Sequence, residues 1–155
     1  MDLPWQVLAA DIALALALLV SVITDLRSRL ILNAVTFPAL AIVLVCAFWV
    51  GGWPELLWSM VGTAVCAMPL LITAAINSKW MSWGDVKLMA VVGAAAGWPA
   101  ALGVLAYVSV AGGVQALLWI VAARLRGHEP PKYVPYGVAI TAGTLAAFLW
   151  GDRLF

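Results

Sequence analysis

The chain has 155 residues, of which 66% are hydrophobic and only 10% are charged. A soluble domain of this length needs many more charged residues to cover its surface, so the composition excludes an ordinary soluble protein and predicts one membrane domain over residues 1–155. The formal net charge of +1 provides no basic patch, which excludes nucleic acid as a typical partner.

The apolar segments are long and continuous rather than alternating, which predicts α-helices. A bilayer core of about 30 Å requires about 20 apolar residues per crossing, and lipid offers no partner to unpaired backbone groups. We therefore predict an all-α integral membrane protein with six transmembrane helices. In chain order, these helices cover residues 5–24, 31–50, 55–77, 82–97, 99–123 and 136–150.

The basic residues predict how these helices are oriented. With six crossings, all but one of the eight lysines and arginines fall on one side of the membrane. Positive residues are retained in the cytoplasm, so both termini are expected outside, in the periplasm. The N-terminus lacks the basic region of a secretory signal, so the first apolar segment is expected to remain as a span. The larger group is Arg27, Arg29, Lys79, Lys87, Arg124, Arg126 and Lys132, with Arg153 on the other side.

Two further patterns agree with this arrangement of helices. Gly93 and Gly97 are separated by three alanines, a small-residue pattern that favours close packing between helices. The nine tryptophans lie towards the ends of the predicted helices, as in an interfacial belt. Trp80, Trp83 and Trp119 lie towards the cytoplasmic ends, and the outer ends have Trp5, Trp49, Trp53, Trp58, Trp98 and Trp150.

Two acids are predicted to lie at the same depth on the cytoplasmic side. Asp25 ends the first predicted helix, and Asp85 opens the fourth after two further crossings. Two neighbouring carboxylates cannot both ionise comfortably, so one keeps a proton. The ionised group can take a proton from water that attacks an amide carbonyl, while the protonated group donates to the developing oxyanion. The pair titrates as one coupled unit, so acid and base are not assigned individually.

Simpler interpretations of these acids remain open. Asp85 could cap the fourth helix, where the N-terminal dipole favours an acid, and Asp25 could pair with Arg29. Asp11 lies inside the first predicted helix, about 21 Å from Asp25 along its axis, so it cannot join the pair. A wet outer pocket or a later helix start would explain Asp11, although an acid within a span is a functional candidate.

Three segments resemble motifs of the type IV prepilin peptidase family, which are membrane aspartyl proteases of the GxGD type. Residues 25–33 resemble the first aspartate motif, and residues 84–88 (Gly-Asp-Val-Lys-Leu) resemble the second. Residues 135–137 (Pro-Tyr-Gly) resemble the turn before the last helix of the family. The three segments occur in the family order, and the resemblance covers nearly the whole chain.

The resemblance implies a hydrolase that removes the basic leader of prepilins or pseudopilins at the cytoplasmic face of the bacterial inner membrane. It implies Asp25 and Asp85 as the catalytic pair, with no cofactor and no metal. The chain resembles the minimal members of tight-adherence (Flp) pilus systems, because no tetracysteine zinc loop of the larger, methyltransferase-bearing members fits between its first two helices. The residues that support the motifs are Gly84, Lys87, Asn33, Arg27, Pro135, Tyr136 and Gly137.

Several of these residues have a structural interpretation beside the functional one. Arg27 and Lys87 each lie two positions from an aspartate, so on a helix they point away from it and are expected to anchor the interface. Asn33 could cap the second helix or orient the pair, and Tyr136 could bond near the site or serve as an interfacial aromatic.

The chain departs from the family pattern at three positions. Ser82 replaces the first glycine of G-x-G-D, Leu32 replaces a proline, and Val138 replaces a second proline. Glycine permits backbone conformations that serine resists. The backbone before Asp85 could therefore differ in shape from that of the family, and the chain could be less active.

Two other functions compete with a peptidase. In a proton- or cation-coupled transporter, Asp25, Asp85 and Asp11 would relay the ion, which predicts acids spread through the membrane and a repeat with broken helices. We find no internal repeat in the sequence. The departure at Ser82 also allows a catalytically silent membrane protein of pilus assembly.

Overall fold

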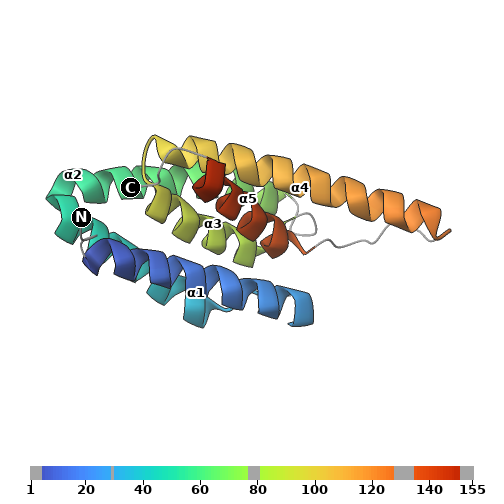
Figure 1. The fold of residues 1–155 in the computed structure, drawn as a ribbon, viewed down its shortest axis with the longest axis horizontal. Helices are drawn as coiled ribbons and strands as arrows, with labels where there is room; N and C mark the ends of the chain where they lie inside the picture. Colours follow the sequence, from blue (N-terminus) through green and yellow to red (C-terminus); the bar gives the residue numbers. More distant parts are fainter. Residues whose placement is uncertain (1–4, 29, 77–80, 128–134, 151–155) are drawn as a thin grey trace.

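The computed structural model describes residues 5–28, 30–76, 81–127 and 135–150. These residues form helices and short connections without any β-strand, which confirms the all-α prediction (Figure 1). The helices are α1 (Trp5–Ser28), α2 (Asn33–Ile76), α3 (Trp83–Ala96), α4 (Ala100–Leu125) and α5 (Tyr136–Trp150).

Helix α2 is divided into two arms by a kink at Gly52. Its 44 residues would extend about 66 Å as one straight helix, twice the thickness of a bilayer core. Gly52 has φ 66° and ψ −148°, a backbone conformation that glycine adopts without steric cost, and Pro54 follows inside the next turn. Figure 1 shows that the chain reverses at this bend, so that both arms extend from it towards the other end of the bundle. The arms correspond to the second and third predicted helices.

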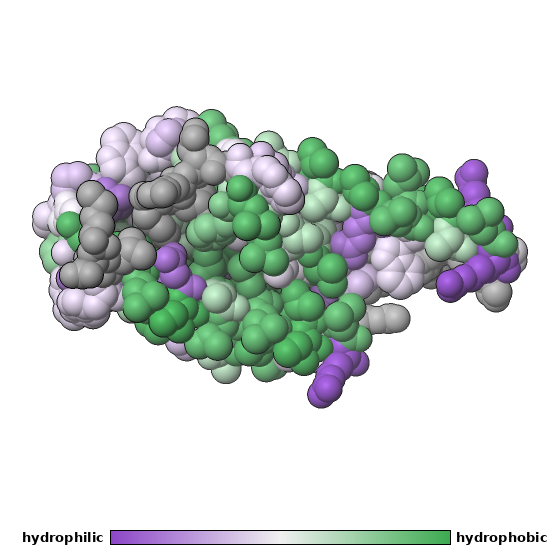
Figure 2. Space-filling model, viewed as in Figure 1, coloured by the Kyte–Doolittle hydropathy of each residue, from purple (hydrophilic) through white to green (hydrophobic). Residues whose placement is uncertain are grey.

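Among the described residues, three helices are long and apolar enough to cross a membrane, namely α1, α2 and α4. Helix α5, with 15 residues, is a shorter apolar helix. Figure 2 shows hydrophobic side chains along the length of the bundle, with hydrophilic ones where α1 and α4 end. This distribution is that of a multi-pass membrane protein.

The described basic residues and the six tryptophans of the predicted outer belt lie towards opposite ends of the bundle. The basic residues that the structure describes lie in the last turns of α1 and α4 and early in α3, which share one end in Figure 1. The six tryptophans of the predicted outer belt are exposed, and they flank the other end, where α2 bends. The described basic residues are Arg27, Lys87, Arg124 and Arg126, whereas Arg29, Lys79, Lys132 and Arg153 lie outside the described residues.

Helix α3 is the core of the bundle. It contacts all four other helices, and 11 of its 14 residues are buried. A helix that is apolar on every side is expected in such a buried position. The size of the side chains of α3 therefore determines how closely the surrounding helices can approach.

The closest approach to α3 comes from the second arm of α2, where two glycines face each other. A Cβ atom on Gly93 would lie 2.7 Å from the Cβ of Cys66 and closer still to the carbonyl oxygen of Gly62. Next to this contact, the Ser59 hydroxyl donates a 2.6 Å hydrogen bond to the carbonyl of Ala94. The small-residue pattern therefore serves close helix packing, as predicted.

We expect Gly93→Ala to lower the stability of the protein in detergent, because the added methyl group has no space beside Gly62 and Cys66. Overpacking of this kind costs about 1–3 kcal/mol. Thermal unfolding of the purified protein measures the effect. The matched control is Gly103→Ala on α4, where a Cβ atom meets nothing within 4 Å; equal melting temperatures for the two variants would contradict the expectation.

Candidate active site

Asp25 lies in the last turn of α1 and is almost completely buried, with 1% of its surface exposed. Its Oδ2 atom accepts a 3.0 Å hydrogen bond from the backbone N–H of Gly137, 112 residues later. Gly137 is the second residue of α5, where backbone N–H groups have no partner within the helix and the dipole favours negative charge. The start of α5 therefore holds the carboxyl group of Asp25.

Asp85 is the third residue of α3 and is equally buried, at 1% exposure. It forms a capping box with Ser82: the Ser82 hydroxyl accepts from the N–H of Gly84 at 3.1 Å, and Asp85 Oδ2 accepts from the N–H of Ser82 at 3.2 Å. The helix-cap interpretation of Asp85 is therefore confirmed. The cap uses only one of the two carboxyl oxygens.

The other oxygen of Asp85 is the unusual feature of this cap. Oδ1 is buried and accepts no hydrogen bond from any residue that the structure describes. A buried polar atom without a partner is costly, so such an atom in a native protein requires an explanation. A proton on Oδ1, or a water or substrate group bound to it, would supply one.

Ser82 does not strain the turn that precedes Asp85. Its φ of −77° and ψ of 143° lie in the extended region, which any residue adopts. The replacement of the usual glycine therefore requires no special backbone conformation, and the serine hydroxyl adds a cap that glycine lacks. At position 84, glycine is required for a different reason: a Cβ atom there would lie 2.7 Å from the Cβ of Ile31.

The fold brings the two acids to one place. Helix α1 ends, and α3 and α5 begin, at the same end of the bundle (Figure 1). The carboxyl group of Asp85 lies within electrostatic reach of Asp25 and of the hydroxyl group of Tyr136. The predicted pair thus shares a buried site with the Pro-Tyr-Gly turn. Any pairing of Asp25 with Arg29 lies outside the described residues.

Comparison with known sequences agrees with this geometry. The profile of the type IV leader peptidase family matches residues 12–117. The chain belongs to this family. Both aspartates fall within the matched region, whereas the turn at residues 135–137 follows it, so the place of the turn in the site comes from the structure.

Curated relatives of this leader peptidase family are named prepilin leader peptidase/N-methyltransferase. The chain is 30% identical to the one from Aeromonas hydrophila over 97% of its own length and 52% of the relative. It is 28% identical to the one from Pseudomonas putida over 100% of its length and 56% of the relative. It is 28% identical to the one from Xanthomonas campestris over 84% of its own length and 46% of the relative. The chain spans about half the length of these relatives. No solved structure matches it significantly.

Two residues of α4 that the motifs do not include hold the start of α5. The Gln115 side chain donates a 2.8 Å hydrogen bond from Nε2 to the carbonyl of Pro135. One turn earlier, Tyr136 packs on Gly112, where a Cβ atom would lie 2.6 Å from the tyrosine oxygen. A polar amide inside an apolar helix was the signal in the sequence that could have pointed to Gln115.

Lys87 and Asn33 join the starts of α3 and α2. Lys87 Nζ donates a 2.7 Å hydrogen bond to Asn33 Oδ1 and lies 5.3 Å from the centroid of the Phe37 ring. Asn33 thus links two helices at the end where the aspartates lie. Arg27 is exposed in the last turn of α1, where an interfacial anchor is expected.

Asp11 lies in a different part of the bundle. Helix α1 begins at Trp5 and includes Asp11, so the interpretation that invoked a later helix start is wrong. Its Oδ1 atom is buried without a hydrogen bond from the described residues. Among those residues, no cluster of three or more His, Cys, Asp or Glu side chains is placed to hold a metal ion.

Proposed function

We propose that the chain is an aspartyl endopeptidase that removes the basic leader of prepilins or pseudopilins, with Asp25 and Asp85 as the catalytic pair. The observation that carries the proposal is the convergence of two buried carboxyl groups from distant segments in a member of a leader peptidase family. One oxygen of Asp85 accepts no hydrogen bond from the described residues. A solvated helix cap would have no reason to be buried beside a second acid.

The pair holds a single proton, because two carboxylates in a buried site cannot both ionise. The ionised member takes a proton from water as the water oxygen attacks the carbonyl carbon of the scissile amide. The protonated member donates its proton to the developing oxyanion. When the C–N bond breaks, the leaving nitrogen takes a proton from the pair, and one hydroxyl group of the tetrahedral intermediate gives its proton back to the pair as the carboxyl product forms. The pair thus regains its single proton. Exclusion of water strengthens the coupling between the two groups.

The substrate in this proposal is a membrane-inserted precursor. Its basic leader stays in the cytoplasm, and its hydrophobic segment lies against the helices of the enzyme. The exposed apolar side chains along α1 and α4 support such a contact within the bilayer. The dyad and water are sufficient for the reaction, so the proposal includes no cofactor.

The decisive experiment incubates the detergent-solubilised protein with a purified candidate prepilin and follows loss of the leader by mass spectrometry. Cleavage at a single bond between the basic leader and the hydrophobic segment is the expected result. An intact precursor, with flux of protons or cations into proteoliposomes, would instead identify a transporter. An intact precursor without ion flux would indicate a catalytically silent protein of pilus assembly.

We further propose six crossings of the bacterial inner membrane, made by α1, both arms of α2, α3, α4 and α5, with both termini in the periplasm. The described basic residues lie at the end where the aspartates lie, and such residues are retained on the cytoplasmic side. The active site then faces the cytoplasm, where the basic leader is found.

Reporter fusions test this orientation. Alkaline phosphatase needs disulfides that form in the periplasm, so we expect it to be active when fused after Gly52, at the bend of α2, and inactive after Arg126, beyond α4. Green fluorescent protein after Arg126 should fluoresce. The reverse pattern of phosphatase activity would place the aspartates on the periplasmic side.

A further inference from the structure

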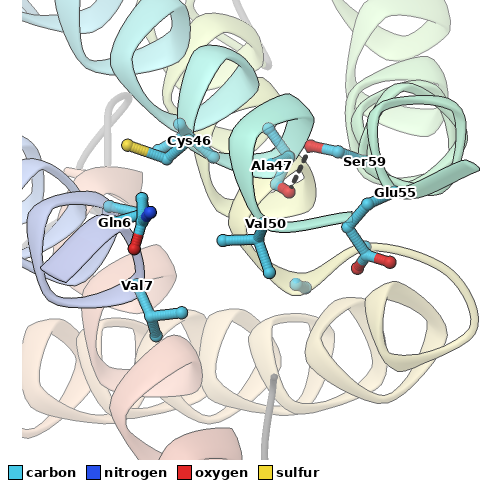
Figure 3. Close-up of a pocket in the computed structure, with 12 residues that line it drawn as sticks. Gln6, Val7, Cys46, Ala47, Val50, Glu55 and Ser59 are labelled. Carbon is cyan, nitrogen blue, oxygen red and sulfur yellow. Dashed lines mark hydrogen bonds between the residues drawn. The ribbon is translucent and has the colours of Figure 1, made fainter. Parts of the chain in front are cut away.

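The end of the bundle opposite the aspartates contains a cavity of about 350 Å³ (Figure 3). It lies between α1, both arms of α2 and the end of α3. Gly97, which lines it, follows Asp85 by 12 residues, or about 18 Å along a helix. Its volume falls within the range of about 300–1,000 Å³ that is typical of small-molecule sites. The cavity is therefore a separate candidate binding site.

The walls of the cavity are apolar over most of their area, and aliphatic side chains come from three sides. Ala10 belongs to α1, Val43 and Val50 to the first arm of α2, and Ala96 to α3. A surface of this kind suits a hydrocarbon chain.

Two hydrogen-bond acceptors lie among the residues that line the cavity. Gln6 Oε1 is buried and accepts no hydrogen bond from the described residues, and Glu55 brings a carboxylate from the second arm of α2. Figure 3 shows these two side chains on different helices around the cavity. The Ser59 hydroxyl donates to the carbonyl of Ala94, and no lysine or arginine is among the lining residues that the structure describes. A ligand with hydrogen-bond donors would satisfy Gln6 Oε1, and its positive charge would complement Glu55.

The surroundings of the cavity match the level of lipid headgroups. Trp5, next to Gln6, and Trp49, next to Val50, form an edge-to-face pair with ring centroids 5.6 Å apart. Trp53, two residues before Glu55, is 68% exposed. Exposed tryptophans of membrane proteins gather where the hydrocarbon core meets the headgroups.

We propose that this cavity binds one aminophospholipid. Its acyl chain lies between the apolar walls, and its ammonium group donates hydrogen bonds to Gln6 Oε1 and the Glu55 carboxylate. The site does not depend on the activity of Asp25 and Asp85, which lie at the other end of the bundle.

Native mass spectrometry of the detergent-solubilised full chain tests the proposal with two probes that share a 12-carbon chain, lauroyl-lysophosphatidylethanolamine and lauroyl-lysophosphatidylglycerol. We expect one bound molecule of the first, with an apparent Kd at least about tenfold lower than that of the second. Free phosphoethanolamine, which lacks the chain, should not bind. Equal retention of both lipids, or binding of phosphoethanolamine alone, would overturn the proposal.

Three variants locate the site. Ala47→Phe fills the cavity and should weaken binding of the ethanolamine lipid about tenfold or more, whereas Leu57→Phe, at a position 56% exposed, should not. Glu55→Gln and Gln6→Leu add no bulk, so they should fold normally and reduce the preference between the two lipids. Unchanged binding and preference in Ala47→Phe and Glu55→Gln would show that the lipid binds elsewhere.

Discussion

Replacing either aspartate by asparagine should lower the rate of leader cleavage by about 10²- to 10⁴-fold, the usual contribution of a positioned acid or base. Asparagine preserves the shape of the side chain and an oxygen that can accept from Gly137 at position 25 or from Ser82 at position 85. The hydrogen bonds that hold the site are therefore retained, and only the ability to ionise is lost. The measurement is kcat/KM on a purified prepilin, beside the melting temperature of each variant.

The double variant Asp25→Asn/Asp85→Asn provides a sharper test of the pair. Residues that act as one unit give strongly non-additive effects, so the double variant should be little slower than the slower single variant. Asp11→Asn is the control, because Asp11 lies in the same helix as Asp25 but far from the site. Cleavage at the normal rate by Asp25→Asn or by Asp85→Asn would contradict the proposed mechanism.

Gly137→Ala is the second substitution for which we expect a large effect. A Cβ atom at this position would lie 2.9 Å from Oδ2 of Asp25, a distance that real Cβ contacts do not reach. The carboxyl group must move away, and the 3.0 Å hydrogen bond from the Gly137 N–H lengthens or breaks. We expect kcat to fall by about 10²-fold, since a displacement near 1 Å has that cost in a positioned site.

The readout for Gly137→Ala separates a displaced site from an unstable protein. Gly113→Ala on α4, where a Cβ atom meets nothing within 4 Å, is the matched control and should cleave at the normal rate. The melting temperature of Gly137→Ala should stay close to that of the unmodified protein, although its kcat is much lower. If Gly137→Ala cleaved as fast as Gly113→Ala, the start of α5 would not position Asp25.

Local patterns in the sequence predicted the helices and much of their limits. The first helix, predicted at residues 5–24, extends to Ser28, and the last, predicted at 136–150, has those bounds. The break between the second and third predicted helices coincides with the kink at Gly52. These features depend on the hydropathy of neighbouring residues and on glycine and proline, which act over a few positions of the chain.

The aspartates were found in the sequence because each lies where a polar segment meets an apolar one. The resemblance also named residues 135–137, but the contact of Gly137 with Asp25 and the role of Gln115 were not predicted, because these contacts join segments far apart. Gly137 bonds to Asp25 across 112 residues, and Gln115 holds Pro135 from the middle of an apolar helix. Asn33, which the sequence left open as a helix cap or as a residue that orients the pair, accepts a hydrogen bond from Lys87.

The sequence by itself therefore determined that this protein is helical and has long apolar segments typical of a membrane protein, and it predicted two acids at helix ends of similar depth. Only the tertiary structure decided that α1, α3 and α5 meet at one end, so that both acids are buried together and one oxygen of Asp85 accepts no hydrogen bond from the described residues. The reason is that hydropathy determines how deeply each helix enters the bilayer. Which helices become neighbours depends instead on side-chain packing, such as the contact of Gly62 with Gly93, and no local pattern encodes it.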